Sequence, residues 1–326
     1  MQLNELLALP KIDLHCHLDG SINLGLVSDL LGRDVAPSEL QVAEDCKSLA
    51  EYLHKFDLPL QCMNTAAGLY RTAKQFMLDL SAENVVYVEA RLAPLQSVNQ
   101  NISAFQVMEA VIDGMEAGRQ ETGIDYGVIA CVMRHHALDD SRQMIRDIND
   151  FWGHGLCALD LAGDEAAYPM SMFSDLFASV AKEGHPFTIH AGECHDHKNV
   201  AVALNTGARR IGHGIAISGQ AQLIDTCREH KIGIEMCPTS NLQTKAVDSL
   251  HEFPLREFLA AGLKVTVNTD NRTVSNTSLT REMALLVDNF GLTETELRQI
   301  TANAADTAFA SPEIKAKLRK KIWHER

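Results

Sequence analysis

The sequence predicts an α/β fold, a (β/α)8 barrel of the TIM type in which strands and helices alternate around a closed ring. Eight short apolar runs with strand character recur along the chain, and segments with helical spacing separate them. The runs cover residues 11–16, 85–91, 126–132, 157–161, 187–190, 210–213, 232–237 and 264–268. A doubly wound open sheet is the alternative, but it favours a glycine-rich nucleotide-binding turn after its first strand, where this chain has His-Cys-His.

The predicted helices lie between these strands. Apolar residues recur with helical spacing over residues 103–122, 139–152, 219–230 and 254–261. Thr293, followed three residues later by Glu296, predicts the N-cap and capping box of a closing helix. We therefore expect one barrel domain over residues 1–326.

A long stretch from about residue 20 to about residue 84 follows the first predicted strand. Its apolar residues, Leu49 and Leu53 among them, have a helical or irregular period and never alternate as they would in a strand. We expect a helical insertion after the first strand.

The composition excludes several classes of partner. The 326 residues, 46% of them hydrophobic, are enough to bury a large core. The net charge of -14 and the pI of about 5.4 argue against a nucleic-acid partner, because phosphate-binding surfaces need clustered Lys and Arg. The first ten residues lack the basic segment of a signal peptide, and no apolar run is long enough to cross a bilayer. We expect a soluble, cytoplasmic protein with no membrane partner.

The cysteines agree with a reducing compartment. The eight cysteines are scattered without Cys-x-x-Cys pairs, and several lie in apolar runs. Such usage is typical of reduced thiols in the cytosol, so we expect no disulfides. The sequence does not indicate the oligomeric state.

The first predicted strand opens directly into two histidines. In the segment Lys11-Ile-Asp-Leu-His-Cys-His-Leu-Asp-Gly20, His15 and His17 are two residues apart, which places both rings on one side of a strand. Both imidazoles can then reach one metal ion. Two ligands do not complete a zinc site, however, and a lone His-x-His is equally compatible with a polar strand end.

Further metal-capable residues stand at the ends of other predicted strands. His190 ends the fifth strand with Glu193 three residues on, His213 ends the sixth, and Asp270 follows the eighth. Each one alone is more often a structural residue, but in a barrel all of these strand ends meet at one face. Together they predict a catalytic zinc site with an open position for water. Its ligands would be His15, His17, His190 and Asp270.

Six segments in order make the chain resemble the adenosine deaminase family of zinc hydrolases. They are Asp13-Leu-His-Cys-His-Leu-Asp-Gly20, Leu159-Asp-Leu-Ala-Gly-Asp-Glu165, His190-Ala-Gly-Glu193, Arg210-Ile-Gly-His-Gly214, Pro238-Thr-Ser-Asn241 and Asn268-Thr-Asp270. The resemblance spans nearly the whole chain. It implies a barrel with one Zn2+ that converts adenosine and deoxyadenosine to inosine and deoxyinosine with loss of ammonia, as in purine salvage or catabolism.

The resemblance also assigns roles to single residues. His15, His17, His190 and Asp270 match the zinc ligands, Glu193 matches the proton donor and His213 matches the catalytic histidine. The positions that match substrate contacts are His17, Asp19 and Gly163.

The chemistry explains these residue types. Zinc lowers the pKa of a bound water to about 7, and His213 can take or hold the proton. Attack on the purine ring moves charge onto the neighbouring ring nitrogen, which a protonated carboxyl of Glu193 would stabilise. Glu193 could instead orient His190. Gly163 either leaves room for a flat ring or is needed only for the turn after the fourth strand. Asp19 either accepts a hydrogen bond from a sugar hydroxyl or caps the helix that follows.

One position departs from the commoner pattern of the family. Many members have a second aspartate after the ligand Asp270, where it hydrogen-bonds the purine, and this chain has Asn271. An amide donates a hydrogen bond while neutral, whereas a carboxyl must first be protonated. The exchange is therefore compatible with purine binding.

Three other functions remain open at this stage. The first is deamination of a related aminopurine such as adenine, and the second is a non-catalytic, metal-stabilised binding protein. A binding protein needs no general acid, so Glu193 and His213 argue against it. The third is an amide- or ester-cleaving hydrolase with two metals bridged by a modified lysine, but Lys198 lies well beyond His190. With Asp19 and no basic cluster nearby, we expect nucleosides to be preferred to adenine or AMP.

Overall fold

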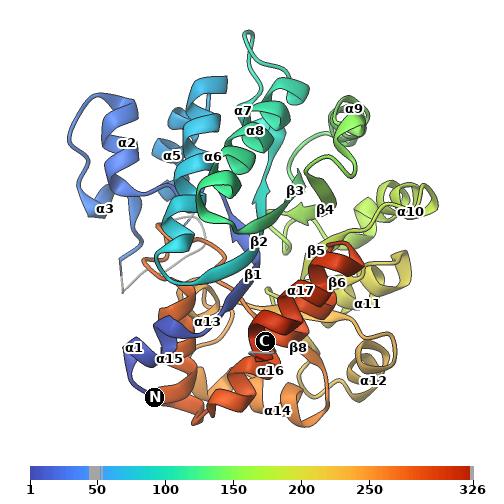
Figure 1. Cartoon of the computed structure of the whole chain (residues 1–326). Helices are drawn as coiled ribbons and strands as arrows, with labels where there is room; N and C mark the ends of the chain where they lie inside the picture. The colour runs from blue at the N-terminus through green and yellow to red at the C-terminus, as the bar shows by residue number, and fades with distance from the viewer. Residues whose placement is uncertain (44–51, 53, 324–326) are drawn as a thin grey trace.

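Eight parallel strands form the centre of the molecule (Figure 1). The computed structural model describes residues 1–43, 52 and 54–323. The strands make two four-stranded sheets, each in sequential order. Their bounds are β1 Lys11–His17, β2 Val85–Leu92, β3 Asp125–Met133, β4 Leu156–Ala162, β5 Thr188–Ala191, β6 Arg210–His213, β7 Gly233–Met236 and β8 Lys264–Val267. All eight predicted strands are confirmed, with ends that shift by one residue at most at either end.

Two parallel bridges join the sheets into a ring. Leu159 of β4 pairs with Phe187 before β5, and Cys16 of β1 pairs with Asp270 after β8. At the second junction the His17 N–H donates to the Asp270 carbonyl at 2.6 Å, and the Asp270 N–H donates to the His15 carbonyl at 2.8 Å. The predicted (β/α)8 barrel is therefore confirmed, and the first and last strands meet at the predicted metal ligands.

Helices surround the barrel and cover its strands (Figure 1). The four predicted helices correspond to α8, α9, α12 and α14, although α9 gives way to a 3-10 turn after Asp147. The predicted capping box is present, because Thr293 and Glu296 bond each other's backbone at the start of α16. The bounds outside the insertion are α1 Leu3–Ala8, α7 Pro94–Ser97, α8 Ala104–Thr122, α9 Leu138–Asp147, α10 Ser174–Lys182, α11 His197–Thr206, α12 Ala221–Glu229, α13 Pro238–Gln243, α14 Leu255–Ala260, α15 Leu279–Phe290, α16 Glu294–Thr307 and α17 Pro312–Trp323.

The described part of the predicted insertion contains helices joined by irregular segments, and the insertion is shorter than predicted. It contains α2 Leu24–Leu31, α3 Pro37–Leu40, the 3-10 turn His54–Phe56 and α5 Asp57–Cys62. The next helix, α6 Ala66–Ser81, packs along α8 and contacts β2 as a helix of the barrel itself. The insertion therefore ends before α6 rather than near residue 84. Leu49 and Leu53 lie outside the described residues, as does Cys46.

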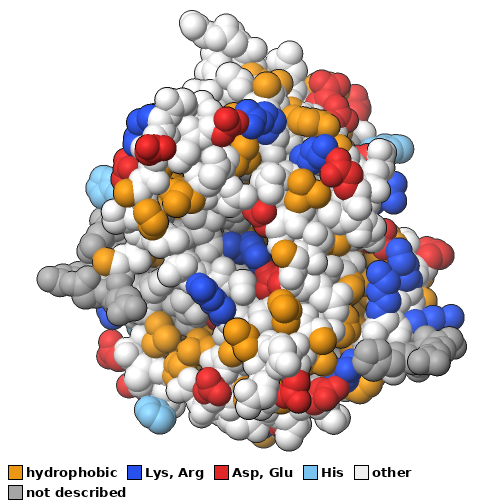
Figure 2. Space-filling view, turned by 60° about the vertical axis from the view of Figure 1, so that its left-hand side comes forward, with side chains coloured by type: hydrophobic (Ala, Val, Ile, Leu, Met, Phe, Trp, Pro, Cys, Tyr) orange, Lys and Arg blue, Asp and Glu red, His pale blue; other side chains and the backbone are white. Residues whose placement is uncertain are grey.

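Acidic and basic side chains are mixed over the face shown in Figure 2, with apolar side chains in small groups between them. Among the described residues, no helix combines the length and the apolar character that a bilayer crossing requires. The seven cysteines of the described part of the chain are free thiols.

Candidate active site

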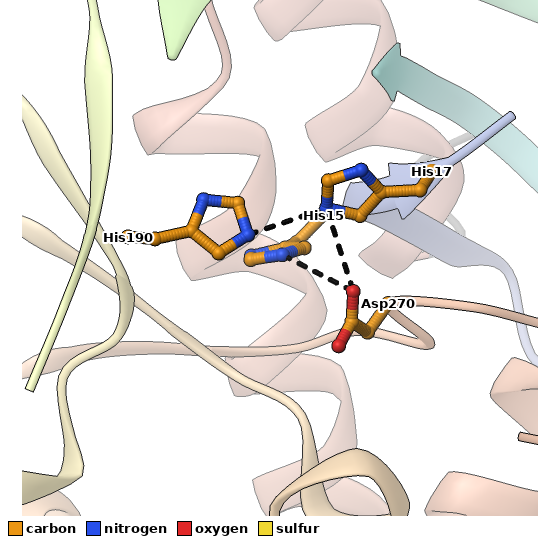
Figure 3. A group of neighbouring side chains, drawn as sticks. All are labelled: His15, His17, His190 and Asp270. Atoms are coloured by element: carbon orange, nitrogen blue, oxygen red, sulfur yellow. Dashed lines mark hydrogen bonds and ion pairs between the residues drawn. The ribbon is translucent and has the colours of Figure 1, made fainter. Parts of the chain in front are cut away.

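Three imidazole rings and one carboxylate point toward one another at the carboxyl ends of the strands (Figure 3). The ring Nε2 atoms of His17 and His190 are 3.2 Å apart. Asp270 Oδ1 lies 3.5 Å from Nε2 of both His15 and His17. One ligand atom from each of the four residues lies within 4.8 Å of the others. The structure thus brings together all four residues that the sequence predicted as a group.

Two buried carboxylates orient two of these rings. His15 Nδ1 lies 3.0 Å from Glu235 Oε2, and His190 Nδ1 lies 2.9 Å from Asp160 Oδ2. Burial opposes the charge on Asp160, but His190 and Arg91 outweigh it and hold the pKa of Asp160 well below its usual value. An ionised carboxylate only accepts, so each Nδ1 carries the proton. The lone pairs on Nε2 then face the centre of the group, as metal ligation requires.

The two carboxylates belong to a buried ionic network inside the barrel. The Arg91 guanidinium donates to Asp160 at 2.8 Å and also to Glu235, and all three side chains are fully buried. Arg210 binds Glu235 and Glu89, each at 2.6 Å. None of these five residues was predicted from the sequence. The available signal was a charged residue in the middle of an apolar strand, as in Val-Glu-Ala-Arg-Leu, Leu-Asp-Leu and Ile-Glu-Met.

Asp270 and His213 adopt backbone angles that non-glycine residues rarely use. Their φ angles are +58° and +61°. The carboxylate of Asp270 accepts from Ser240 Oγ at 2.6 Å, which holds its second oxygen away from the histidines. Unusual backbone geometry of this kind is concentrated at functional sites, where the surrounding contacts maintain it.

Glu193 and His213 face each other beside the metal-binding group. Glu193 Oε2 lies 3.6 Å from His213 Nε2, and Glu193 Oε1 accepts from Thr244 Oγ1 at 3.0 Å. Burial lowers the pKa of His213 to about 4, so the ring is neutral at pH 7. Because Asp160 is the partner of His190, the alternative in which Glu193 orients His190 is wrong.

The amide of Asn241 lies at the other nitrogen of the His213 ring. Asn241 Nδ2 is 3.1 Å from His213 Nδ1. Ser240 and Asn241, both on α13, therefore support Asp270 and His213 from one short helix.

A cavity of about 360 Å³ opens onto this group of residues. Its lining includes the predicted substrate contacts His17, Asp19, Gly163 and Asn271, together with Glu193 and His213. Tyr52, Phe56 and Leu60 of the insertion contribute an apolar wall. None of the described residues that line the cavity is a lysine or an arginine, and Lys198 is exposed on α11.

Asp19 and Gly163 occupy turns beside the cavity. Asp19 is buried and its Oδ1 accepts from the Gly20 N–H at 3.2 Å. The next helix begins at Leu24 with Asn23 as its cap, so the alternative role of Asp19 as a helix cap is wrong. Gly163 has a φ of +101°, and a Cβ there would meet only ordinary contacts. Its backbone conformation, more than a lack of space, therefore calls for glycine.

Asn271 is packed between the turn that follows β1 and the helical insertion. Its Nδ2 donates to the Tyr52 hydroxyl at 2.9 Å. A Cβ on Gly20 would lie 1.8 Å from Asn271 Oδ1, so only glycine allows this close approach. Asn271 Oδ1 is buried and has no hydrogen-bond partner among the described residues.

Comparison with known proteins agrees with this geometry. A sequence profile of the family described as adenosine deaminase matches residues 10–325. An adenosine deaminase of Enterococcus faecalis is 39% identical over 331 residues, covering 99% of this chain and 98% of the relative. The solved N6-methyl-AMP deaminase of Arabidopsis thaliana is 26% identical with a TM-score of 0.85, covering 99% of each chain. A zinc-bound amidohydrolase of Burkholderia ambifaria has a TM-score of 0.89 at 22% identity, covering 99% of this chain and 92% of the other, which shows the shared fold.

Asp160→Asn tests the buried network. The exchange keeps the size of the side chain but removes the charge that faces Arg91 and His190, so we expect the free energy of unfolding to fall by about 3 to 5 kcal/mol. Urea unfolding at pH 7 measures the change. Asp125→Asn is the control, because Asp125 pairs at 2.6 Å with the half-exposed Lys317, and we expect less than about 1 kcal/mol there. Equal losses in the two variants would contradict the central role of Asp160.

Proposed function

Because the chain belongs to the adenosine deaminase family and is a hydrolytic deaminase, we propose that its substrates are adenosine and deoxyadenosine. Water replaces the exocyclic amine, so the products are inosine or deoxyinosine and ammonia. The observation that carries the proposal is the meeting, in one cavity, of a metal-binding group with Glu193 and His213.

The four metal-binding residues suit one zinc ion per chain. Three imidazole nitrogens and one carboxylate oxygen are a donor set that zinc accepts. His15 Nε2 is buried and has no hydrogen-bond partner among the described residues, so its lone pair is available to bind a metal. The ligands would be His15, His17, His190 and Asp270. Zinc bound there would lower the pKa of a water molecule to about 7, which supplies a nucleophile at neutral pH.

Glu193 and His213 would move the protons of the reaction. Addition of water at the amine-bearing carbon pushes charge onto the adjacent ring nitrogen, and Glu193 would donate a proton there. His213 is neutral at pH 7 and would hold the proton that the water loses. Asn241 Nδ2 lies at Nδ1 of this ring, so the nitrogen that faces the site is Nε2, which lies 3.6 Å from Glu193 Oε2.

The charge of the cavity favours a nucleoside over a nucleotide. Asp19, Asp57 and Asp164 line it together with the site carboxylates, and no lysine or arginine is present among its described lining residues. A phosphate group would meet repulsion without a compensating cation. The Arabidopsis relative acts on N6-methyl-AMP, and we expect this chain to differ from it in that respect.

We also place the enzyme in purine salvage or catabolism in the cytoplasm. Free thiols at all seven described cysteines suit a reducing compartment. The substrate is expected to be a small purine nucleoside rather than a nucleic acid.

A deaminase assay with adenosine, deoxyadenosine, adenine and AMP side by side tests the proposed substrates. We expect the two nucleosides to be turned over far faster than the free base or the nucleotide. Metal analysis of the same preparation should return one zinc per chain, and removal of the metal by a chelator should abolish turnover. Equal kinetics for adenosine and adenine would favour the alternative function as an adenine deaminase.

Glu193→Gln tests the proton donor. The amide keeps the shape of the side chain but cannot supply the proton, so we expect kcat to fall by about 10² to 10⁴-fold. Zinc content and melting temperature should stay near those of the wild-type enzyme. If the variant lost its metal together with its activity, Glu193 would have a structural role instead.

Asp19→Ala tests recognition of the sugar. Loss of a charged acceptor for a sugar hydroxyl should lower kcat/KM for adenosine. The loss in transition-state stabilisation that this ratio reports should be about 1 to 3 kcal/mol. Burial raises the pKa of Asp19 to about 6, so the charge is present above that pH and is lost as the pH falls below it. The difference between wild type and variant should therefore be largest above pH 6 and shrink toward pH 5. A variant that melts earlier yet keeps full turnover would refute sugar binding by Asp19.

A further inference from the structure

We propose that Glu165 is a positioning residue that fixes the turn carrying Glu193. The proposal rests on the role of Glu193 as proton donor described above, and it adds a residue of the cavity wall that acts through the backbone of Glu193 rather than on the metal-binding atoms. Glu165 follows β4, and the turn that it binds follows β5.

The carboxylate of Glu165 accepts from three consecutive backbone N–H groups. Oε1 accepts from Gly192 at 2.7 Å, and Oε2 accepts from Glu193 at 3.0 Å and from Cys194 at 3.2 Å. The side chain is only 5% exposed, so little water competes for these donors. Successive N–H groups that converge on one anion form a nest, and here the anion belongs to the chain itself.

The turn is held from other directions as well. Arg134, which follows β3, donates from Nη2 to the carbonyl of His190 at 2.6 Å. A Cβ on Gly192, whose φ is +78°, would lie 2.9 Å from a methyl group of Val200, so the turn lies too close to α11 for any residue but glycine at this position. Arg134 thus holds the start of the turn and Glu165 holds its end.

This arrangement sets the distance between the metal-binding group and the proton donor. His190 and Glu193 are three residues apart on the same turn, and the Glu193 carboxyl is aimed by Thr244 on one side and by His213 on the other. A shift of the backbone at residue 193 would carry the carboxyl away from the ring nitrogen of the substrate. Misplacement by about 1 Å can cost about 10²-fold in rate.

Only a carboxylate can satisfy all three donors. A glutamine at position 165 has one acceptor oxygen, and its NH2 group would face at least one backbone N–H. We therefore expect Glu165→Gln to loosen the turn while the fold and the metal-binding residues stay in place. A merely structural residue would change the melting temperature without a selective effect on kcat.

The test compares Glu165→Gln with wild type in the zinc-loaded enzyme. We expect kcat for adenosine to fall by about 10 to 100-fold with KM changed by less than about 3-fold. Zinc content should be unchanged. Backbone amide exchange at Gly192, Glu193 and Cys194 should become faster, because their acceptor is lost. The amide exchange measurement does not depend on the substrate. If the wild-type protein did not deaminate adenosine, the proposed function would be contradicted, and the exchange rates at the turn would still decide the role of Glu165.

Two further variants keep the test decisive. Glu257→Gln is the matched control, since Glu257 also accepts a backbone N–H, from Gly219 at 2.8 Å, in a loop without site residues; we expect no change in kcat. Glu165→Asp keeps the charge, but its side chain is one methylene shorter, so the carboxylate lies farther from the three N–H groups. This variant should lose activity, and it provides the test if Glu165→Gln does not fold. Full kcat in a folded Glu165 variant, unchanged amide exchange at the turn, or loss of zinc together with activity would each overturn the proposal.

Discussion

The site depends on one buried guanidinium. Arg91 binds both Asp160 and Glu235, and these carboxylates in turn lie against His190 and His15. Without the cation, two carboxylates close together in the low-dielectric interior would repel each other and take up protons. With it they stay ionised, and each presents an acceptor to a ring Nδ1. The buried ion pairs inside the barrel thus set the direction of the Nε2 lone pairs, which the proposed metal binding requires.

Closure of the barrel supplies the second constraint. The pairing of Cys16 with Asp270 joins the first strand to the segment after the last one, so residues more than 250 positions apart become neighbours. The backbone of Asp270 then turns into the left-handed region, and Ser240 holds its carboxylate. Strain at such a position is tolerated because the surrounding bonds leave it no alternative. The same junction brings Asn271 against Gly20 and the insertion.

Segments outside the strand–helix alternation of the barrel form the walls of the cavity and so limit which substrates fit. The insertion after β1 contributes Tyr52, Phe56 and Leu60 to one wall, while the turn after β5 brings Glu193 to the other side. An apolar wall suits a flat purine ring, and the acidic lining without a described cation disfavours phosphate. The residues proposed for metal binding and proton transfer therefore lie at the barrel ends, whereas the proposed substrate selection is shared with segments added to the barrel.

The sequence by itself determined the eight strands, the group of His15, His17, His190 and Asp270, and the place of Glu193, because strand periodicity and the common face of barrel strands are local rules. It did not reveal Arg91, Asp160 and Glu235 as supports of the histidines, nor Glu165 as the acceptor of a distant turn. Their partners lie 25 to 220 positions away along the chain. A charged residue in an apolar strand signals a buried ion pair, but only closure of the barrel selects which charges meet.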